Sequence, residues 1–143
     1  MAQSPVLLVP VDGSEEAKRA LNHALTLAKE LSGSIMILNV QPHFNTPNVK
    51  RFFSEEAVHD YQQQLGREAV EKSLEVVKEE NIQVEQKIVI GVPSDEICKV
   101  AKEINALSII MGSRGLGAVK AKFLGSVSYS VLHDAPCPVT IVP

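Results

Sequence analysis

The sequence predicts an α/β fold in which a parallel sheet of five strands is covered by helices on both faces. Five short runs rich in β-branched residues alternate with four stretches of helical period, and this alternation is typical of strands joined by crossover helices. No internal repeat of roughly 20–50 residues is present, which argues against a solenoid or a propeller. A chain of 143 residues fits one domain, so we expect a single domain over residues 1–143.

The strands are predicted from the apolar runs. Their ranges are Val6–Val11, Ser34–Val40, Gln83–Ile90, Leu107–Met111 and Val139–Val142. The first and the fourth are apolar almost throughout, as expected of central strands that are covered on both faces. Because crossover connections are right-handed, we expect a doubly wound, Rossmann-like sheet with strand order 3-2-1-4-5, which reverses direction beside the first strand.

The first of four predicted helices covers about Ser14 to Ser32. Glu15 and Glu16 stand in its first turn, where carboxylates suit the positive end of the helix dipole. Gly33 is placed to end the helix. Its apolar stripe, expected to face the sheet, consists of Ala17, Ala20, Leu21, Ala24, Ala28 and Leu31.

The other three helices follow the later strands. The second is predicted from about Ser54 to Glu80, and Gly66 inside it costs about 1 kcal/mol relative to Ala, which weakens the case for an unbroken helix. The third begins at Pro93 or Ser94, and the fourth runs from near Gly125 to about His133. The apolar residues of the second and third helices are Tyr61, Leu65, Ala69, Leu74, Val77, Ile97, Val100, Ala101 and Ile104.

One long segment, from Gln41 to Phe53, has no regular period and contains two prolines and two asparagines. A connection of this length inside a compact domain is usually a functional flap or a mobile loop. Two interpretations of Phe52 and Phe53 stay open. They either pack at the start of the second long helix or form a hydrophobic edge over a bound base.

The composition limits the classes of protein. Hydrophobic residues make up 45% and charged residues 22% of the chain, as in soluble globular proteins. The formal net charge is −3, and four Phe, two Tyr and no Trp leave little to stack on bases, so nucleic acid is not expected as a partner.

The N-terminal residues have no cationic start, and their apolar run ends at Pro10 and Asp12. That run is too short for a signal peptide or a membrane span, so we expect no membrane association and a cytoplasmic location. Cys98 and Cys137 show no C-x-x-C spacing and are too few for a disulfide framework. We expect both to be inert, buried or half-buried thiols.

The segment from Ile109 to Val131 concentrates glycine and serine between two apolar runs. It is not a Walker A loop, because Ala118 and Val119 stand where that motif needs Lys and Ser or Thr, and the dinucleotide motif G-x-G-x-x-G does not follow the first strand. What remains is Gly112-x-x-Gly115, nine residues, and then Gly125-Ser126 at a predicted helix start.

This spacing favours an anion site. Gly112, Gly115 and Gly117 can adopt positive φ and turn successive N–H groups toward one concavity. The helix that begins after Gly125 adds unpaired N–H groups and its positive dipole end, and the hydroxyls of Ser126 and Ser128 can also donate. A triphosphate suits such a site. A tight strand-to-helix connection with ordinary capping explains the same residues equally well.

The fold rule places a crevice at this point. Ligands of doubly wound sheets bind outside the carboxyl ends of the strands, where the strand order reverses. If the fourth strand lies beside the first, the crevice is lined by "VPVDGS" after the first strand and by "MGSRG" after the fourth.

The spacing also resembles the ATP-binding signature of the universal stress protein family, G-x-x-G-x9-G-[ST], and the match is complete. The resemblance extends over nearly the whole chain. "VPVDGSEEAKRALNHALTLA" is similar to the family's first strand and helix, "GVPSDEICKVAKE" to its G-x-P segment, and "CPVTIV" to its terminal strand. The resemblance implies ATP as the ligand, a role in stress response and a homodimer through Val139–Val142. We expect a divalent ion, Mg or Mn, on the phosphates, because the sequence offers few other counter-charges.

The resemblance assigns roles to individual residues. Pro10, Val11 and Asp12 would border the adenine and ribose, with the Asp12 carboxylate accepting from a ribose hydroxyl, and Val40 would supply an apolar wall for the base. An alternative for Asp12 is a cap flanking the first helix. The residues implied around the ribose and phosphates are Met111, Gly112, Ser113, Arg114, Gly115, Leu116, Gly117, Ala118, Gly125, Ser126, Val127 and Ser128.

The sequence identifies no catalytic residue. None of the four histidines pairs with a Ser, Cys or carboxylate near the expected crevice, and no cluster of His and Cys has metal-ligand spacing. We therefore expect a binding protein, a nucleotide-dependent sensor or regulator of stress response with an unidentified protein partner. Two alternatives stay open. One is a slow ATPase or nucleotidyl-transfer enzyme on the related adenine nucleotide α-hydrolase-like fold, and the other is a structural homodimer without nucleotide.

Overall fold

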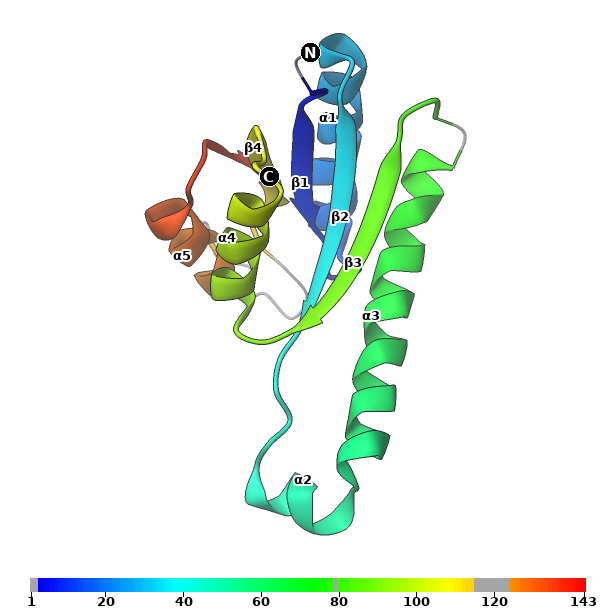
Figure 1. The fold of residues 1–143 in the computed structure, drawn as a ribbon, viewed down its shortest axis with the longest axis vertical. Coiled ribbons are helices and arrows are strands. Elements are labelled where there is room, and N and C mark those ends of the chain that lie inside the picture. The colour runs from blue at the N-terminus through cyan, green and yellow to red at the C-terminus, as the bar shows by residue number, and fades with distance from the viewer. Residues whose placement is uncertain (1–2, 79, 115–123) are drawn as a thin grey trace.

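The computed structural model describes residues 3–78, 80–114 and 124–143. Its five strands form one parallel sheet of order β3-β2-β1-β4-β5, with helices on both faces (Figure 1). The strands are β1 Val6–Pro10, β2 Ser34–Gln41, β3 Val84–Ile90, β4 Ser108–Gly112 and β5 Val139–Val142. The helices are α1 Glu15–Leu31, α2 Pro47–Phe52, α3 Glu55–Val77, α4 Pro93–Glu103 and α5 Ser126–Asp134. The predicted class, strand order and four longer helices are confirmed.

The sheet separates two apolar cores. On one face α1 and α3 cover side chains such as Val9 and Ile37, and on the other α4 and α5 cover side chains such as Leu8 and Leu38. Leu7, Leu8 and Val9 of β1 are at most 1% exposed. β1 and β4 are therefore the central strands covered on both faces, as predicted.

The ends of α1 explain its bounds. Ser14 caps the helix, and its Oγ accepts from the N–H of Ala17 at 3.2 Å. At the other end Ser32, not the predicted Gly33, adopts the left-handed conformation, with φ of 51°. The fold requires glycine at position 33 because of a close contact. A Cβ there would lie 2.6 Å from the carbonyl oxygen of Pro5.

The long helix α3 continues through Gly66. A Cβ at Gly66 would lie 2.6 Å from Cγ2 of Ile88 and 3.2 Å from Oδ1 of Asn39, so the glycine lets α3 approach β2 and β3 closely. Two residues predicted on buried helix faces are exposed. Tyr61 of α3 is 55% exposed, and Leu31 of α1 is 44% exposed. For Tyr61 the reason is that the first part of α3 extends past the sheet (Figure 1).

The segment from Gln41 to Phe53 is not irregular throughout, because it contains the short helix α2. Thr46 caps α2, and its Oγ1 accepts from the N–H of Val49 at 3.3 Å. Residues 42–62 thus form an arm, made of α2, the residues before it and the start of α3, that projects beyond the carboxyl ends of β2 and β3 (Figure 1).

None of the helices in the described ranges combines the length and the apolar character needed to cross a membrane.

Candidate functional site

A cavity of about 440 Å³ lies at the carboxyl ends of β1 and β4, where the sheet reverses direction. This is the position at which doubly wound sheets bind their ligands. The cavity is lined by Pro10, Val11, Asp12, Ser14, Ala17, Leu38, Val40, Pro93, Ile97, Met111, Gly112, Arg114, Gly125, Ser126, Val127 and Ser128.

With one exception, the predicted site residues that the structure describes line this cavity. The exception, Ser113, acts through its backbone. Its N–H donates to the carbonyl of Val142 at 2.9 Å, and its carbonyl accepts from the N–H of Gly125 at 2.8 Å. Ser113 therefore holds the start of α5 beside the end of β4. The predicted residues Gly115, Leu116, Gly117 and Ala118 lie outside the described residues.

Five lining residues were not predicted. They are Ser14, Ala17, Leu38, Pro93 and Ile97. One of them carried a usable signal. Leu38 stands two residues before Val40, a predicted site residue, and so shares its face of the strand.

One end of the cavity is apolar. Leu38, Ile97 and Met111 are at most 5% exposed, and they stand with Pro10 and Val40 along the lining. These side chains come from three adjacent strands and from α4, so they form a continuous hydrophobic wall. A wall of this kind suits a flat apolar group such as an aromatic ring.

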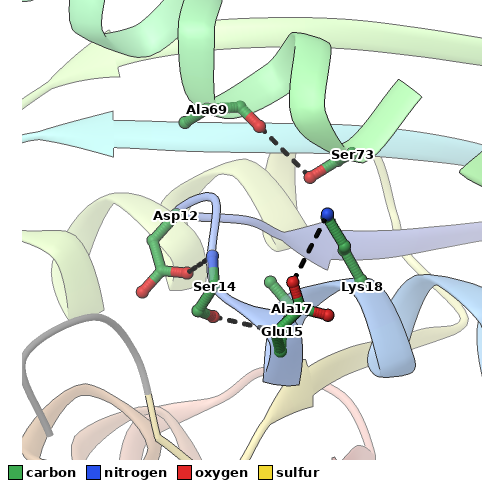
Figure 2. Close-up of polar contacts among 7 residues, drawn as sticks. All are labelled: Asp12, Ser14, Glu15, Ala17, Lys18, Ala69 and Ser73. Carbon is green, nitrogen blue, oxygen red and sulfur yellow. Dashed lines mark hydrogen bonds and ion pairs between the residues drawn. The ribbon is translucent and has the colours of Figure 1, made fainter. Parts of the chain in front are cut away.

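The turn from β1 into α1 supplies polar groups. Oδ1 of Asp12 accepts from the N–H of Ser14 at 2.9 Å, and Ser14 in turn caps α1 (Figure 2). The structure thus confirms that Asp12 flanks the helix cap. Gly13 makes the turn possible with a φ of 87°, a value that side chains disfavour. Lys18 pairs with Glu15 at 3.5 Å (Figure 2).

The start of α5 lies on the β4 side of the cavity, where the N–H of Gly125 donates to the carbonyl of Ser113, and β1 separates this side from Val40 on β2. Gly125 is the N-cap and contributes no side chain that could accept from the first-turn N–H groups. Ser126, Val127 and Ser128 make up that turn and line the cavity. The N–H groups of a first helical turn have no partner within the helix and lie at the positive end of the dipole. This side of the cavity therefore favours an anionic group.

Gly112 does not have the positive φ predicted for it. Among the described glycines only Gly13 has a positive φ, and Gly112 ends β4 as a strand residue. A Cβ at Gly112 would lie 2.7 Å from Cβ of Glu16 and 3.0 Å from its backbone carbon. The glycine is required because the first turn of α1 packs directly on the end of β4.

Ser128 connects the two sides of the site. It is 3% exposed, and its Oγ donates to the carbonyl of Gly112 at 2.9 Å. The Ser128 hydroxyl, which was predicted to donate to phosphate, instead donates to the end of β4. Ser126 is exposed and also lines the cavity. Of the two serines in this turn, Ser126 is therefore the one whose hydroxyl is accessible to solvent.

The charged lining residues are Asp12 and Arg114. Within the described ranges no group of three or more His, Cys, Asp and Glu side chains could hold a metal ion. Cys98 and Cys137 lie outside the cavity lining and are half-buried free thiols, as predicted. Burial raises the pKa of both thiols, and the charges of Asp134 and Asp95 add to the effect on Cys98.

The Phe52 and Phe53 side chains do not line this cavity. Phe53 instead lines a second cavity together with Ala57 and Val58 of α3. Phe53 thus lies beside the start of α3 but is 60% exposed, and the structure places neither phenylalanine as an edge over the first cavity.

The fold and the cavity define a doubly wound α/β protein with a cavity at the switch point of its sheet. The chain belongs to the universal stress protein family, whose model matches residues 5–143. It is 34% identical over 144 residues to "Universal stress protein YxiE" of Bacillus subtilis, and the match covers 95% of this chain and 97% of the relative.

Solved structures show the same fold. The structure of the hypothetical protein MJ0577 superposes with a TM-score of 0.79 at 30% identity and covers 99% of this chain and 96% of that chain. A universal stress protein from Archaeoglobus fulgidus, solved in complex with dAMP, superposes with a TM-score of 0.72 at 21% identity and covers each chain fully, 100% and 100%.

Proposed function

We propose that this protein binds ATP in the cavity between β1 and β4 and acts as an ATP-dependent regulator in stress response. The observation that carries the proposal is the division of the cavity into two ends. The wall around Val40 is apolar, and the first turn of α5 at Ser126 presents N–H groups. A nucleotide has the same division, with a flat base at one end and an anionic chain at the other.

The two ends fix an orientation for the nucleotide. The adenine lies on Val40 beside Pro10 and Val11, and the ribose lies near Asp12, whose carboxylate accepts from a ribose hydroxyl. The phosphates lie at the N-terminus of α5, where the helix dipole and the Arg114 guanidinium favour negative charge. Gly115, Leu116, Gly117 and Ala118 complete the phosphate side in this proposal, and a Mg or Mn ion bound to the phosphates neutralises the remaining charge.

The adenosine and the triphosphate of the proposed ligand are supported by different observations. The dAMP complex of the Archaeoglobus fulgidus protein supports a site for an adenine nucleotide. The complete spacing G-x-x-G-x9-G-[ST] from Gly112 to Ser126 supports a longer phosphate chain.

The assembly and the cellular setting are also part of the proposal. β5, Val139–Val142, lies at an edge of the sheet and pairs with β4 on one side. Because an apolar edge strand needs a cover, pairing with β5 of a second copy forms a homodimer. The dimer acts in the cytoplasm, and ATP occupancy changes its affinity for a regulatory protein partner.

The nucleotide retained during purification provides the test. The freshly purified protein is denatured, and the supernatant is chromatographed against AMP, ADP, ATP and GTP standards. We expect adenine nucleotide, with ATP as the main species, in an amount approaching one per chain. A folded protein that retains no nucleotide and takes up none on incubation with ATP would refute the proposal.

A further inference from the structure

The arm, residues 42–62, exposes large apolar side chains to solvent. The guanidinium of Arg51 lies 5.6 Å from the centroid of the neighbouring Phe52 ring. Phe52 is 71% exposed, Phe53 60% and Tyr61 55%. No residue of α2 is buried, and the arm extends beyond the sheet (Figure 1). Large apolar side chains grouped in this way mark an interaction surface.

The arm also contains a cavity of about 460 Å³ between α2 and α3. Its lining is apolar and consists of Phe44, Val49, Phe53, Ala57, Val58 and Tyr61. The rings of Phe44 and Tyr61 lie 6.3 Å apart between centroids. Phe52 is not part of this lining. The arm therefore carries an apolar cavity and, on α2, the exposed Phe52 side chain, which could fill such a cavity in another molecule.

The arm also carries charges of both signs, in two separate helical turns. The last turn of α2 holds Lys50 and Arg51, and the first turn of α3 holds Glu55 and Glu56. All four are exposed. Among the described residues, no ion pair includes Lys50, Glu55 or Glu56. The arm thus offers one basic and one acidic turn, on either side of Phe52 and Phe53 in the chain.

We propose that the arm docks on the arm of a second copy of this chain about a two-fold axis. In an isologous contact each patch meets its own copy in the reverse direction, so the basic turn of each arm faces the acidic turn of the other. The same operation directs Phe52 of each copy toward the cavity of its partner. A partner surface of a single charge would be repelled by one of the two turns, which is why the observations favour a second copy.

This contact is separate from the proposed pairing through β5. The arm connects β2 and β3 at one side of the sheet, whereas β5 is the edge strand of the other side. Both contacts can therefore form together, and arm docking joins β5-paired dimers into larger assemblies. The proposal does not depend on nucleotide binding.

Charge reversal tests the proposal. One variant combines Lys50→Glu with Arg51→Glu, so that both turns are acidic, and the other combines Glu55→Lys with Glu56→Lys, so that both are basic. Each alone should raise the dissociation constant of arm docking at least about tenfold at low ionic strength, because like charges then face each other. Mixed in equal amounts, the two variants should associate again. Sedimentation velocity over a range of protein concentrations measures each case.

Matched controls separate docking from net charge and from folding. The control for the Glu55→Lys and Glu56→Lys variant combines Glu71→Lys with Glu75→Lys, which makes the same change in net charge at exposed positions of α3 outside the arm. The control for the Lys50→Glu and Arg51→Glu variant combines Lys99→Glu with Lys102→Glu at exposed positions of α4. Both controls should have the same distribution of assembly masses as the unaltered protein. All these side chains are exposed, so circular dichroism should show the same fold as in the unaltered protein. The melting temperature should fall slightly in the variants that reverse charges in the first turn of α3 or in the last turns of α2 and α4, because those charges then oppose the helix dipoles.

Phe52→Ser completes the test, because it removes the side chain directed toward the partner's cavity. We expect it to weaken association as strongly as either charge variant. If Phe52→Ser and both charge variants keep the mass distribution of the unaltered protein, or if mixing the charge variants restores nothing, the proposal is wrong and the patch serves a partner of a different sequence.

Discussion

Asn39 donates from Nδ2 to the carbonyl oxygen of Val11 across 2.8 Å. Asn39 is 2% exposed, and its Oδ1 accepts from Nε2 of Gln41, also at 2.8 Å. The N–H of Val11 donates to the carbonyl of Leu38 at 2.8 Å. Val11 directly follows β1 and lines the cavity. The Asn39 hydrogen bond therefore holds the end of β1 in place beside the apolar residues of β2 that also line the cavity.

Replacing Asn39 should therefore affect both stability and the cavity. Asn39→Leu leaves the buried carbonyl of Val11 without its partner, which should lower the free energy of unfolding by about 1–3 kcal/mol. It should also weaken ATP binding while leaving the affinity for inorganic tripolyphosphate unchanged, because Val11 borders the base and ribose. Urea denaturation and a titration with each ligand measure these effects. Equal losses for both ligands would show that Asn39 acts on the fold alone.

Two glycines of the signature, Gly112 and Gly125, should respond differently to alanine. Gly112→Ala places a Cβ 2.7 Å from Cβ of Glu16, and should destabilise the protein by about 1–3 kcal/mol. At Gly125 the nearest atoms to a Cβ, in Arg114 and Ser113, are 3.5 Å away. Gly125 is the N-cap of α5, and alanine is a poorer N-cap than glycine, so Gly125→Ala should lower the free energy of unfolding by only about 0.5–1 kcal/mol. Guanidinium denaturation measures both variants. A Gly125→Ala change that costs more than Gly112→Ala would contradict the described packing.

Gly66→Ala tests the close approach of α3 to the sheet. In a solvent-exposed helix this change stabilises by about 1 kcal/mol, but here the new Cβ would lie 2.6 Å from Cγ2 of Ile88. We expect a net loss of about 1–3 kcal/mol from overpacking. The same change in an Ile88→Ala background should cost less, because the opposing atoms are gone. A gain in stability from Gly66→Ala alone would contradict the observed contact.

The thiols should be poorly reactive in the folded protein. Burial raises the pKa of Cys98 and of Cys137, so less of the reactive thiolate is present near pH 8 than in the unfolded chain. Iodoacetamide should alkylate both more slowly in buffer than in denaturant, and Cys98→Ser and Cys137→Ser assign each rate. Because the folded state holds these protons more tightly, their contribution to stability is present at neutral pH and lost as the pH rises through the raised pKa values. Equal rates in both states would contradict the described burial.

The strands were predictable because they depend on local pattern, and the position of the cavity was predictable because it follows from the strand order. Val139–Val142 is a strand with the predicted bounds, and Pro10, Asp12 and Gly112 lie at one cavity as predicted. The helix α2 was missed because it is six residues long and buries no side chain. It therefore leaves no apolar periodicity in the sequence.

The structural reasons for Gly33 and Gly112 could not be predicted from the sequence. Gly112 and Gly33 were explained by backbone conformation, but the structure requires them because Glu16 and Pro5 lie within 3 Å of where a Cβ would stand. Such distances depend on how helices and strands far apart in the chain pack together. A single sequence shows the glycine, but the neighbouring atom becomes visible only in the fold.

The proposed ATP site is tested most directly by equilibrium dialysis of labelled ATP against the purified, nucleotide-free protein and its Val40→Trp variant. Val40 is half-buried and lines the apolar end of the cavity, so an indole there should fill the space for the base while the fold remains intact. We expect one ATP per chain in the unaltered protein and none at the same concentration in the variant. No retention of ATP by the unaltered protein, or equal retention by a folded Val40→Trp variant, would contradict the proposed site.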